Sequence, residues 1–399
     1  MNVLVTDGEN RSSLAVTRSL GRKGFKVVVT SRKNPCLSSV SKYCQLGLHV
    51  PDPIEEGENF VGTIIDISAM EKIDFIFPMT DQTIILLNRA RKSFPKFTTL
   101  ACPSEEKMNA LSNKVNLFRM AENLNLPIPR TLYLTSNKEL LSIIDNINKF
   151  PVVVKPAFSK IHEKGSFLTG GVDYAGSKDE LIHLYKTRSI LQYPSMIQEK
   201  IIGPGTGLFT LYDENHHMAI FSHRRLREKP PSGGVSVLSE SIPLDEAMVK
   251  AADKILSAVS WNGVAMVEFK RDERDGKAKL MEVNGRFWGT LQLAINCGID
   301  FPNLLLGYLQ GVRNPFPFTN YLIGHKLKWF FGSLDHLIIR LKEKQQEPIS
   351  SPVPSSKWRA LIDFLKVWEK DTSFDVFAFD DPKPFWLEGR LYFRDIFHS

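Results

Sequence analysis

The chain has 399 residues, 43% of them apolar and 24% charged, so it is large enough for two or three packed units and a wholly disordered protein is excluded. No stretch approaches the ~20 consecutive apolar residues that span a bilayer. Asp7 interrupts the apolar start of the chain, so we expect no signal peptide and predict a soluble cytoplasmic protein. The net charge of +7 lies in short runs of mixed sign, which suit phosphate-bearing small molecules at least as well as nucleic acid.

The four cysteines are scattered and lack zinc-ligand spacing, so we expect free thiols in a reducing compartment.

The first hundred residues predict a small parallel α/β unit. Residues 2–6 and 26–30 are β-branched runs that flank a segment with helical spacing, which is typical of a β-α-β unit. Residues 75–78 predict a third buried strand, followed by a helix over 82–93. The turn after the first strand, at Asp7, lacks Gly-x-Gly-x-x-Gly, so the fingerprint of a dinucleotide-binding domain is missing.

From about residue 110 the pattern favours antiparallel α+β structure. A helical segment over 105–125 ends at a connector that contains two prolines. Short apolar runs then predict strands at residues 151–156, 195–200, 207–212, 218–223, 265–270 and 279–283. After residue 311 the composition changes, and the pattern over 325–343 predicts a helix.

The strand candidates that contain Glu268 and Glu282 are joined by a short charged turn. In a hairpin they bring Glu268, Glu282 and Asn284 together, because residues 282 and 284 project from one face of a strand. Two carboxylates and an amide oxygen are hard ligands that suit Mg²⁺. The alternative is a solvated hairpin, but both glutamates lie in apolar runs where an unpaired carboxylate is costly. We therefore predict a metal site there.

Cationic side chains near this hairpin are candidates for phosphate contacts. Arg286 follows on the face of Glu282, where it could stabilise a transferring phosphoryl group or simply form a salt bridge. Lys155 ends a β-branched strand and suits nucleotide phosphates, although a strand can also end in an exposed lysine. The glycine-bearing segment 165–172 could fold its backbone N–H groups over phosphates, or be an ordinary hairpin loop.

Two further segments are candidates for binding small molecules. The edge formed by Glu199, Lys200 and Ile202 could bind adenine through backbone groups, with Ile202 against the base. In an extended strand, residue 223 shares one face with Arg225 and Arg227, whose guanidinium groups could hold a substrate carboxylate or an acyl phosphate. An exposed edge strand with solvated arginines is the alternative.

The order of these motifs over residues 110–310 resembles the ATP-grasp superfamily. The matching positions are Lys114, Lys155, Gly170, Gly171, Glu199, Lys200, Ile202, Glu268, Glu282, Asn284 and Arg286. With the N-terminal α/β unit, the resemblance covers about three quarters of the chain, and it is closest to carboxylate-amine ligases and carbamoyl-phosphate-synthase-like members. Gly285 stands where the family has proline, the loop is less glycine-rich than usual, and no acid matches the ribose contact.

This resemblance implies an α/β and α+β protein with a two-lobed ATP-grasp fold. The expected divisions are a pre-ATP-grasp domain at 1–110, a small lobe at 111–190, a large lobe with the metal site at 191–312, and a C-terminal extension at 313–399. The implied ligands are ATP, bound through Lys114, Lys155 and the adenine edge, and two Mg²⁺ on Glu268, Glu282 and Asn284, with Mn²⁺ as a substitute.

The implied activity is amide or peptide bond formation through an acyl phosphate, with release of ADP and phosphate. Arg286 and Lys155 would be catalytic, and Arg225 and Arg227 would contact the substrate. The expected partners are a small carboxylate and an amine, with neither nucleic acid nor membrane involved. A homodimer is a further possibility. Activation of bicarbonate through carboxyphosphate and a non-catalytic nucleotide-binding module are the alternatives.

Overall fold

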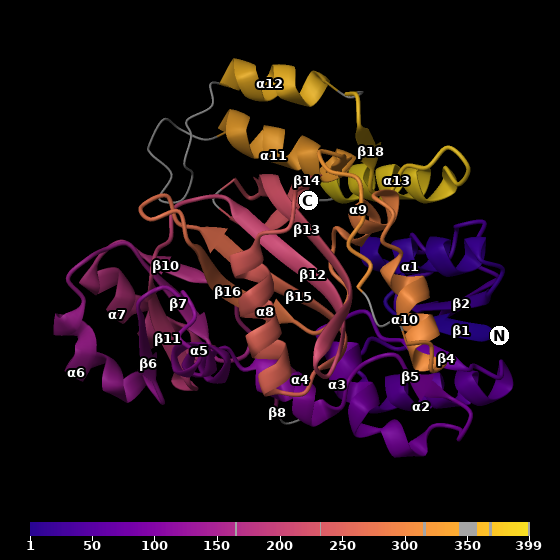
Figure 1. Cartoon of the computed structure of the whole chain (residues 1–399), viewed down its shortest axis with the longest axis horizontal. Helices are drawn as coiled ribbons and strands as arrows, with labels where there is room; N and C mark the ends of the chain where they lie inside the picture. The colour runs from indigo at the N-terminus through magenta and orange to yellow at the C-terminus, as the bar shows by residue number, and fades with distance from the viewer. Residues whose placement is uncertain (164–165, 232, 314–316, 343–356, 367–368, 398–399) are drawn as a thin grey trace.

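The computed structural model describes residues 1–163, 166–231, 233–313, 317–342, 357–366 and 369–397. Its strands form three main sheets and a separate two-stranded hairpin. Figure 1 shows the large third sheet in the middle, the N-terminal unit and the smaller second sheet on either side of it, and the C-terminal helices above it. Among the described residues, no helix is both long and apolar enough to cross a membrane.

The N-terminal unit is a parallel five-stranded sheet in the order β3-β2-β1-β4-β5, as the sequence predicted in outline. Its elements are β1 (Asn2–Val5), α1 (Arg11–Arg22), β2 (Lys26–Ser31), β3 (Leu46–His49), α2 (Gly57–Met70), β4 (Phe75–Phe77), α3 (Asp81–Arg89) and β5 (Thr99–Leu100). The central β-branched strands are buried on both faces, which is typical of a parallel sheet covered by helices. Strands β3 and β5 and helix α2 were not predicted.

The second unit has a four-stranded antiparallel sheet in the order β10-β7-β11-β6. Its elements, with the two helices before it, are α4 (Glu105–Ser112), α5 (Lys114–Asn123), β6 (Thr131–Leu134), α6 (Leu140–Ile143), β7 (Val152–Pro156), β8 (Lys160–Glu163), β9 (Ser166–Thr169), β10 (Asp173–Ala175), α7 (Lys178–Thr187) and β11 (Ser195–Glu199). The predicted single helix over 105–125 is two helices, because the Asn113 side chain accepts a hydrogen bond from the Asn116 N–H and caps α5.

The third sheet has seven strands in the order β16-β15-β12-β13-β14-β17-β18 and includes all the predicted strands after residue 205. Its elements are β12 (Gly205–Asp213), β13 (His216–Lys229), β14 (Val235–Ser241), α8 (Glu246–Ala258), β15 (Asn262–Arg271), β16 (Ala278–Asn284), α9 (Leu291–Asn296) and α10 (Phe301–Leu309). Helix α8 packs on one face of this sheet through a cluster around Trp261, and α9 and α10 pack with the N-terminal unit around Trp288.

The described part of the C-terminal segment contributes two strands to the third sheet, and it also contains three helices. They are β17 (Lys326–Lys328), α11 (Phe330–Lys342), α12 (Lys357–Leu365), β18 (Thr372–Phe374) and α13 (Lys383–Phe397). The predicted helix over 325–343 therefore begins later, because residues 326–328 form β17, which pairs antiparallel with β14. The segment also bonds to the N-terminal unit, where the buried Arg18 Nε donates to Asp381 Oδ2 at 2.9 Å.

Candidate active site

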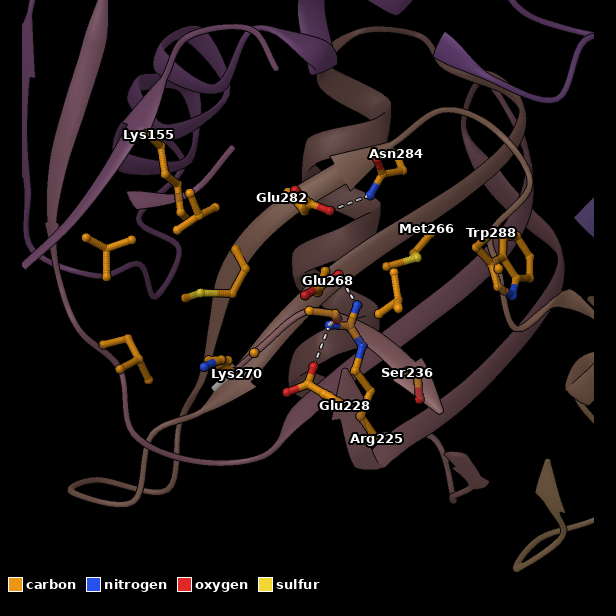
Figure 2. Close-up of a pocket in the computed structure, with 18 of the residues that line it drawn as sticks. Lys155, Arg225, Glu228, Ser236, Met266, Glu268, Lys270, Glu282, Asn284 and Trp288 are labelled. Carbon is orange, nitrogen blue, oxygen red and sulfur yellow. Dashed lines mark hydrogen bonds and ion pairs between the residues drawn. The ribbon is translucent and has the colours of Figure 1, made fainter. Parts of the chain in front are cut away.

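A cavity of about 530 Å³ lies between the second and third sheets. Strands β7 and β11 form one wall, β13, β14, β15 and β16 form the other, and α1 contributes one residue, Arg11. Figure 2 shows polar side chains that point into this space from both walls, with Lys155 opposite Glu282 and Glu268. The cavity therefore gathers most of the charged residues that the sequence singled out.

Glu268 and Glu282 are direct cross-strand partners in the β15–β16 ladder, so the predicted hairpin is confirmed. Their side chains lie on the same face, and two like charges in that arrangement repel each other. Asn284, two residues beyond Glu282, donates through Nδ2 to Glu282 Oε1 at 2.7 Å, which leaves its amide oxygen available. The three predicted metal ligands thus lie together, with like charges that a cation would stabilise.

Arg225 supplies part of the charge that the two glutamates need. Its Nη2 donates to Glu268 Oε2, and its Nη1 donates to Glu228 Oε1 at 2.9 Å (Figure 2). Burial opposes ionisation of Arg225, but these two carboxylates outweigh it and raise the pKa of the guanidinium. Burial raises the pKa of Glu268 above its ordinary value despite Arg225, so Glu268 is the weaker acid of the pair.

Glu282 behaves in the opposite way. Burial also disfavours its charge, but Lys114, the hydrogen bond from Asn284 and Lys155 together lower the pKa of its carboxyl. A buried carboxylate kept ionised by cations that it does not contact directly is a good ligand for a further cation.

Lys155 is the buried cation on the opposite wall, with 8% of the residue exposed. Burial lowers the pKa of its ammonium group to about 8, although Glu282 favours the charged form. No carboxylate among the described residues lies within ion-pair distance of it, and its nearest charged neighbours act only over longer range. A buried ammonium group without an ion-pair partner calls for an anion in the cavity.

Arg286 faces a second cavity of about 320 Å³ that shares Glu282, Asn284 and Arg286 with the first. Its Nε donates to Asp81 Oδ1 at 2.9 Å, at the first turn of α3. The salt bridge of Arg286 is therefore made to the N-terminal unit and not to either glutamate of the hairpin. The attraction of Asp81 raises the pKa of Arg286.

Lys114 lines this second cavity, where its Nζ donates to Ser159 Oγ at 2.7 Å. Gly170 and Gly171 line neither cavity, and of the predicted glycine-bearing loop residue 165 lies outside the described residues. A Cβ at Gly170 would lie 2.7 Å from Ile190 Cγ2, so close packing requires glycine at this position, whereas the space around Gly171 is open.

The predicted adenine edge lies at the end of β11, and only some of its residues line the cavity. Glu199 and Lys200 line the first cavity, and Glu199 also bonds to Arg274 Nη1 at 2.9 Å. Ile202 is 51% exposed and does not line the cavity, whereas Ile201 does and is 4% exposed. Ile201 is therefore the apolar side chain that faces the space, one residue before the predicted one.

The expectation that residues 223, 225 and 227 share one face of a strand is wrong, because β13 is irregular between Arg225 and Glu228. A bulge shifts the alternation of side chains. Arg227 points instead toward α12, where its Nη2 lies 3.3 Å from Asp363 Oδ2. Only His223 and Arg225 of this group line the cavity.

Among the residues of the site that sequence reasoning missed are Arg11, Asp81, Glu228, Trp288 and Thr290. Glu228 was detectable as an acid three residues from Arg225, and Trp288 lies two residues after Arg286, whereas Arg11 and Asp81 reach the site only through contacts between distant segments.

The oxygen donors of the site fit Mg²⁺ bound together with a nucleotide. The described residues contain no cluster of three or more His, Cys, Asp or Glu side chains of the kind that encloses a metal ion. Two carboxylates and one amide oxygen on a single wall match the usual case for Mg²⁺, in which phosphates and water complete the six ligands.

Comparisons with known proteins give a family match for part of the chain. Residues 212–323 match a family described as ATP-grasp in the biosynthetic pathway with Ter operon. A D-aspartate ligase from Enterococcus faecium (strain Aus0004) is 25% identical over 203 residues, which is 44% of this chain and 44% of that relative. The matched part therefore spans less than half the length of that curated relative.

Two solved structures share the fold. Biotin carboxylase from Campylobacter jejuni, in complex with β-γ-ATP, has a TM-score of 0.65 and 16% identity over 81% of this chain and 74% of its own. An L-amino acid ligase from Bacillus licheniformis has a TM-score of 0.58 and 18% identity over 76% of this chain and 73% of its own. Residues 212–323 match an ATP-grasp family, and the parallel N-terminal sheet and the two facing sheets with the cavity between them are shared with these structures, so we identify the fold of this chain as the ATP-grasp fold.

Proposed function

We propose that the chain is an ATP-dependent carboxylate-amine ligase that joins an acid to an amine through an acyl phosphate and releases ADP and phosphate. The observation that carries this proposal is the pairing across one cavity of a buried, unpaired Lys155 with the facing carboxylates of Glu268 and Glu282. A cation on one wall and two acids on the other suit a triphosphate and its metal ion.

The nucleotide is proposed to lie along β11, with its phosphates directed at Lys155 and Lys114. Adenine would lie beside Glu199 and Lys200, with Ile201 as the apolar side chain that contacts it and Ile202 restricted to backbone contacts. The chain would then divide near residues 110, 190 and 312, as expected from the sequence, so that the two lobes on either side of residue 190 form the two walls of this site.

Glu268, Glu282 and Asn284 would hold Mg²⁺, which supplies neutralisation of the phosphate charge when bound. Arg225 holds the Glu268 carboxylate through a direct hydrogen bond, so its proposed role is to position that ligand. Arg286, fixed by Asp81, would stabilise the charge on the transferring phosphoryl group.

In the proposed reaction, a carboxylate oxygen of the acid attacks the γ-phosphorus of ATP, and the bond to the β,γ-bridging oxygen breaks to release ADP. The nitrogen of the amine then attacks the acyl carbon, the acyl C–O bond to phosphate breaks, and the amine gives up a proton as the amide forms. The protein contributes mainly orientation and charge neutralisation, so no covalent nucleophile is required.

A screen of ADP release over carboxylic acids and amino acids, with mass detection of condensed products, tests this function. We expect ADP and phosphate to form only when both an acid and an amine are present. Formation of AMP and pyrophosphate would contradict the scheme, and ADP release that depends on bicarbonate without an amine would favour carboxyphosphate chemistry. ATP binding without any turnover over the full screen would favour a non-catalytic module.

A further inference from the structure

The cavity has a second end, which we call the Arg11 end. It is formed by Arg11, His223, Trp288 and Thr290, and the motifs of the proposed reaction account for none of them. Figure 2 shows Trp288 on the side of the cavity away from Lys155. The lining of the cavity thus continues past the proposed phosphate and metal residues to a separate group of polar side chains.

Arg11 is the first residue of α1, and its side chain is 13% exposed. Its Nη1 donates to Asp375 Oδ2, and its guanidinium carbon lies 3.9 Å from the centre of the Trp329 ring. Among the described residues, no hydrogen bond engages its Nη2, which would lie 3.5 Å from a Cβ placed at Gly289 on the cavity wall. Arg11 is therefore fixed on two sides and has donors left at the cavity.

The two residues that fix Arg11 both belong to the C-terminal segment and are themselves held in place. Trp329 Nε1 donates to Glu388 Oε1 at 2.8 Å, and the backbone N–H of Asp375 donates to the carbonyl of Lys328 at 3.1 Å. A planar guanidinium stacked on an aromatic ring loses little freedom when it binds a carboxylate. This arrangement is typical of a prepared anion-binding residue.

His223 and Trp288 place two unsatisfied polar atoms in the wall of the Arg11 end. His223 is 3% exposed and Trp288 is 2% exposed, and both pack on the Phe209 ring, with ring centres 4.5 and 4.4 Å away. His223 Nε2 bonds to Thr290 Oγ1 at 2.8 Å, but His223 Nδ1 and Trp288 Nε1 are buried without a hydrogen-bond partner. Buried polar atoms of this kind are rare unless a ligand or water satisfies them.

We propose that the Arg11 end binds a second, non-reacting carboxylate of the acid substrate, with Arg11 as the residue that selects for it. This inference rests on the proposed ligase function. The substrate class is a dicarboxylic acid, or an amino acid with more than one carboxylate, of which one group is activated near Lys155 and another is held at Arg11.

The inference also assigns a role to the C-terminal segment. Asp375 and Trp329 hold Arg11 at the cavity, while Arg18 on the same helix bonds to Asp381 with both side chains only 1% exposed. The segment therefore fixes one face of α1 against the third sheet and acts on the substrate through Arg11.

Calorimetric binding of matched acids tests the proposal without relying on turnover. Succinate, glutarate and D-aspartate are compared with butyrate, valerate and D-2-aminobutyrate in the presence of Mg²⁺ and a non-hydrolysable ATP analogue. We expect the wild-type chain to bind at least one diacid about 10- to 100-fold more tightly than its monoacid match, which is the usual value of a charge-assisted hydrogen bond. Arg11→Met should remove this preference and leave the affinity for the ATP analogue within about twofold of wild type.

Arg22→Met is the matched control, because Arg22 lies on the same helix and pairs with Asp380 outside the cavity. It should keep the preference for the diacid. If Arg11→Met does not fold, Arg11→Lys retains a cation beside Asp375 and should keep part of the preference.

A wild-type chain that binds diacids no better than monoacids would overturn the inference, and so would an Arg11→Met chain that keeps the preference. Failure of the proposed ligase function can be distinguished from failure of this inference by the measured result. In that case, binding of diacids stays dependent on Arg11, but no acid and amine pair releases ADP.

Discussion

The two ends of the cavity are built in different ways. At the Lys155 end, the main side chains come from two neighbouring strands, β7 and β11, and from the β15–β16 hairpin that faces them. At the Arg11 end, they come from the first helix, the middle of the third sheet and the loop before α9, and the C-terminal segment fixes Arg11. Local pairing makes the first end, whereas contacts between distant segments make the second.

Their charges differ as well. Lys155 has no ion-pair partner among the described residues, and Glu268 faces Glu282 in the same ladder. The Lys155 end could therefore bind an anion at the lysine and a cation at the two glutamates. Arg11 is already paired with Asp375 and offers only its remaining donors. The Lys155 end is suited to a highly charged ligand with its metal ion, and the Arg11 end to recognition of one group.

The largest effect is expected from Glu282→Gln, because it removes the carboxylate that its surroundings keep ionised. The variant should lower kcat by about 10²- to 10³-fold, which corresponds to several kcal/mol of charge stabilisation by a metal ion. Steady-state ADP release at saturating ATP and a titration with Mg²⁺ measure it.

Glu273→Gln is the control for this prediction, because Glu273 is an exposed acid on the turn of the same hairpin. It should have the kinetics of the wild type. Equal losses in both variants, or a Glu282→Gln chain with an unchanged requirement for Mg²⁺, would remove the proposed difference between the two ends.

The sequence predicts the Lys155 end well because local rules determine it. Glu282 and Asn284 are two residues apart, so alternation along β16 places them on one face, and a six-residue turn brings Glu268 opposite. The burial of Lys155 follows from the β-branched strand that contains it. These rules fail where the strand is irregular, as at Arg227, and where an edge leaves the sheet, as at Ile201 and Ile202.

The Arg11 end cannot be predicted by such rules. Arg11 and its partner Asp375 are 364 residues apart, and neither lies in a motif with a recognisable spacing. Asp81 reaches Arg286 across 205 residues, through the packing of α3 near the end of β16. Contacts of this kind depend on how whole units pack together, which no pattern within one segment records.

A second prediction concerns Lys155, whose pKa burial lowers to about 8. The protonated form is the one that attracts phosphate, so kcat/KM for ATP should be constant below this pH and fall about tenfold per pH unit well above it. The profile is measured at fixed ionic strength, with free Mg²⁺ held constant.

Lys155→Met should lower kcat/KM for ATP by about 10²-fold and abolish this fall at high pH, because no titrating ammonium group remains. Lys155→Arg keeps a permanent charge and should also show no fall near pH 8. A decrease that persists in both variants would assign the titration to another group. The preference for a diacid over its monoacid match, which is assigned to Arg11, should be unchanged in either variant.

The smallest expected effect compares two neighbouring residues at the end of β11. Ile201→Val removes one buried methyl group from the cavity wall and should raise the KM for ATP by about fourfold, because a buried methyl group contributes about 0.8 kcal/mol to an apolar contact. Ile202→Val alters an exposed side chain and should leave the KM within error of the wild type, because the backbone contacts proposed for this residue are retained. Titration of ATP in the ADP-release assay measures both. A larger change for Ile202→Val than for Ile201→Val would show that residue 202 faces the base, and would move the adenine to the outer side of this edge.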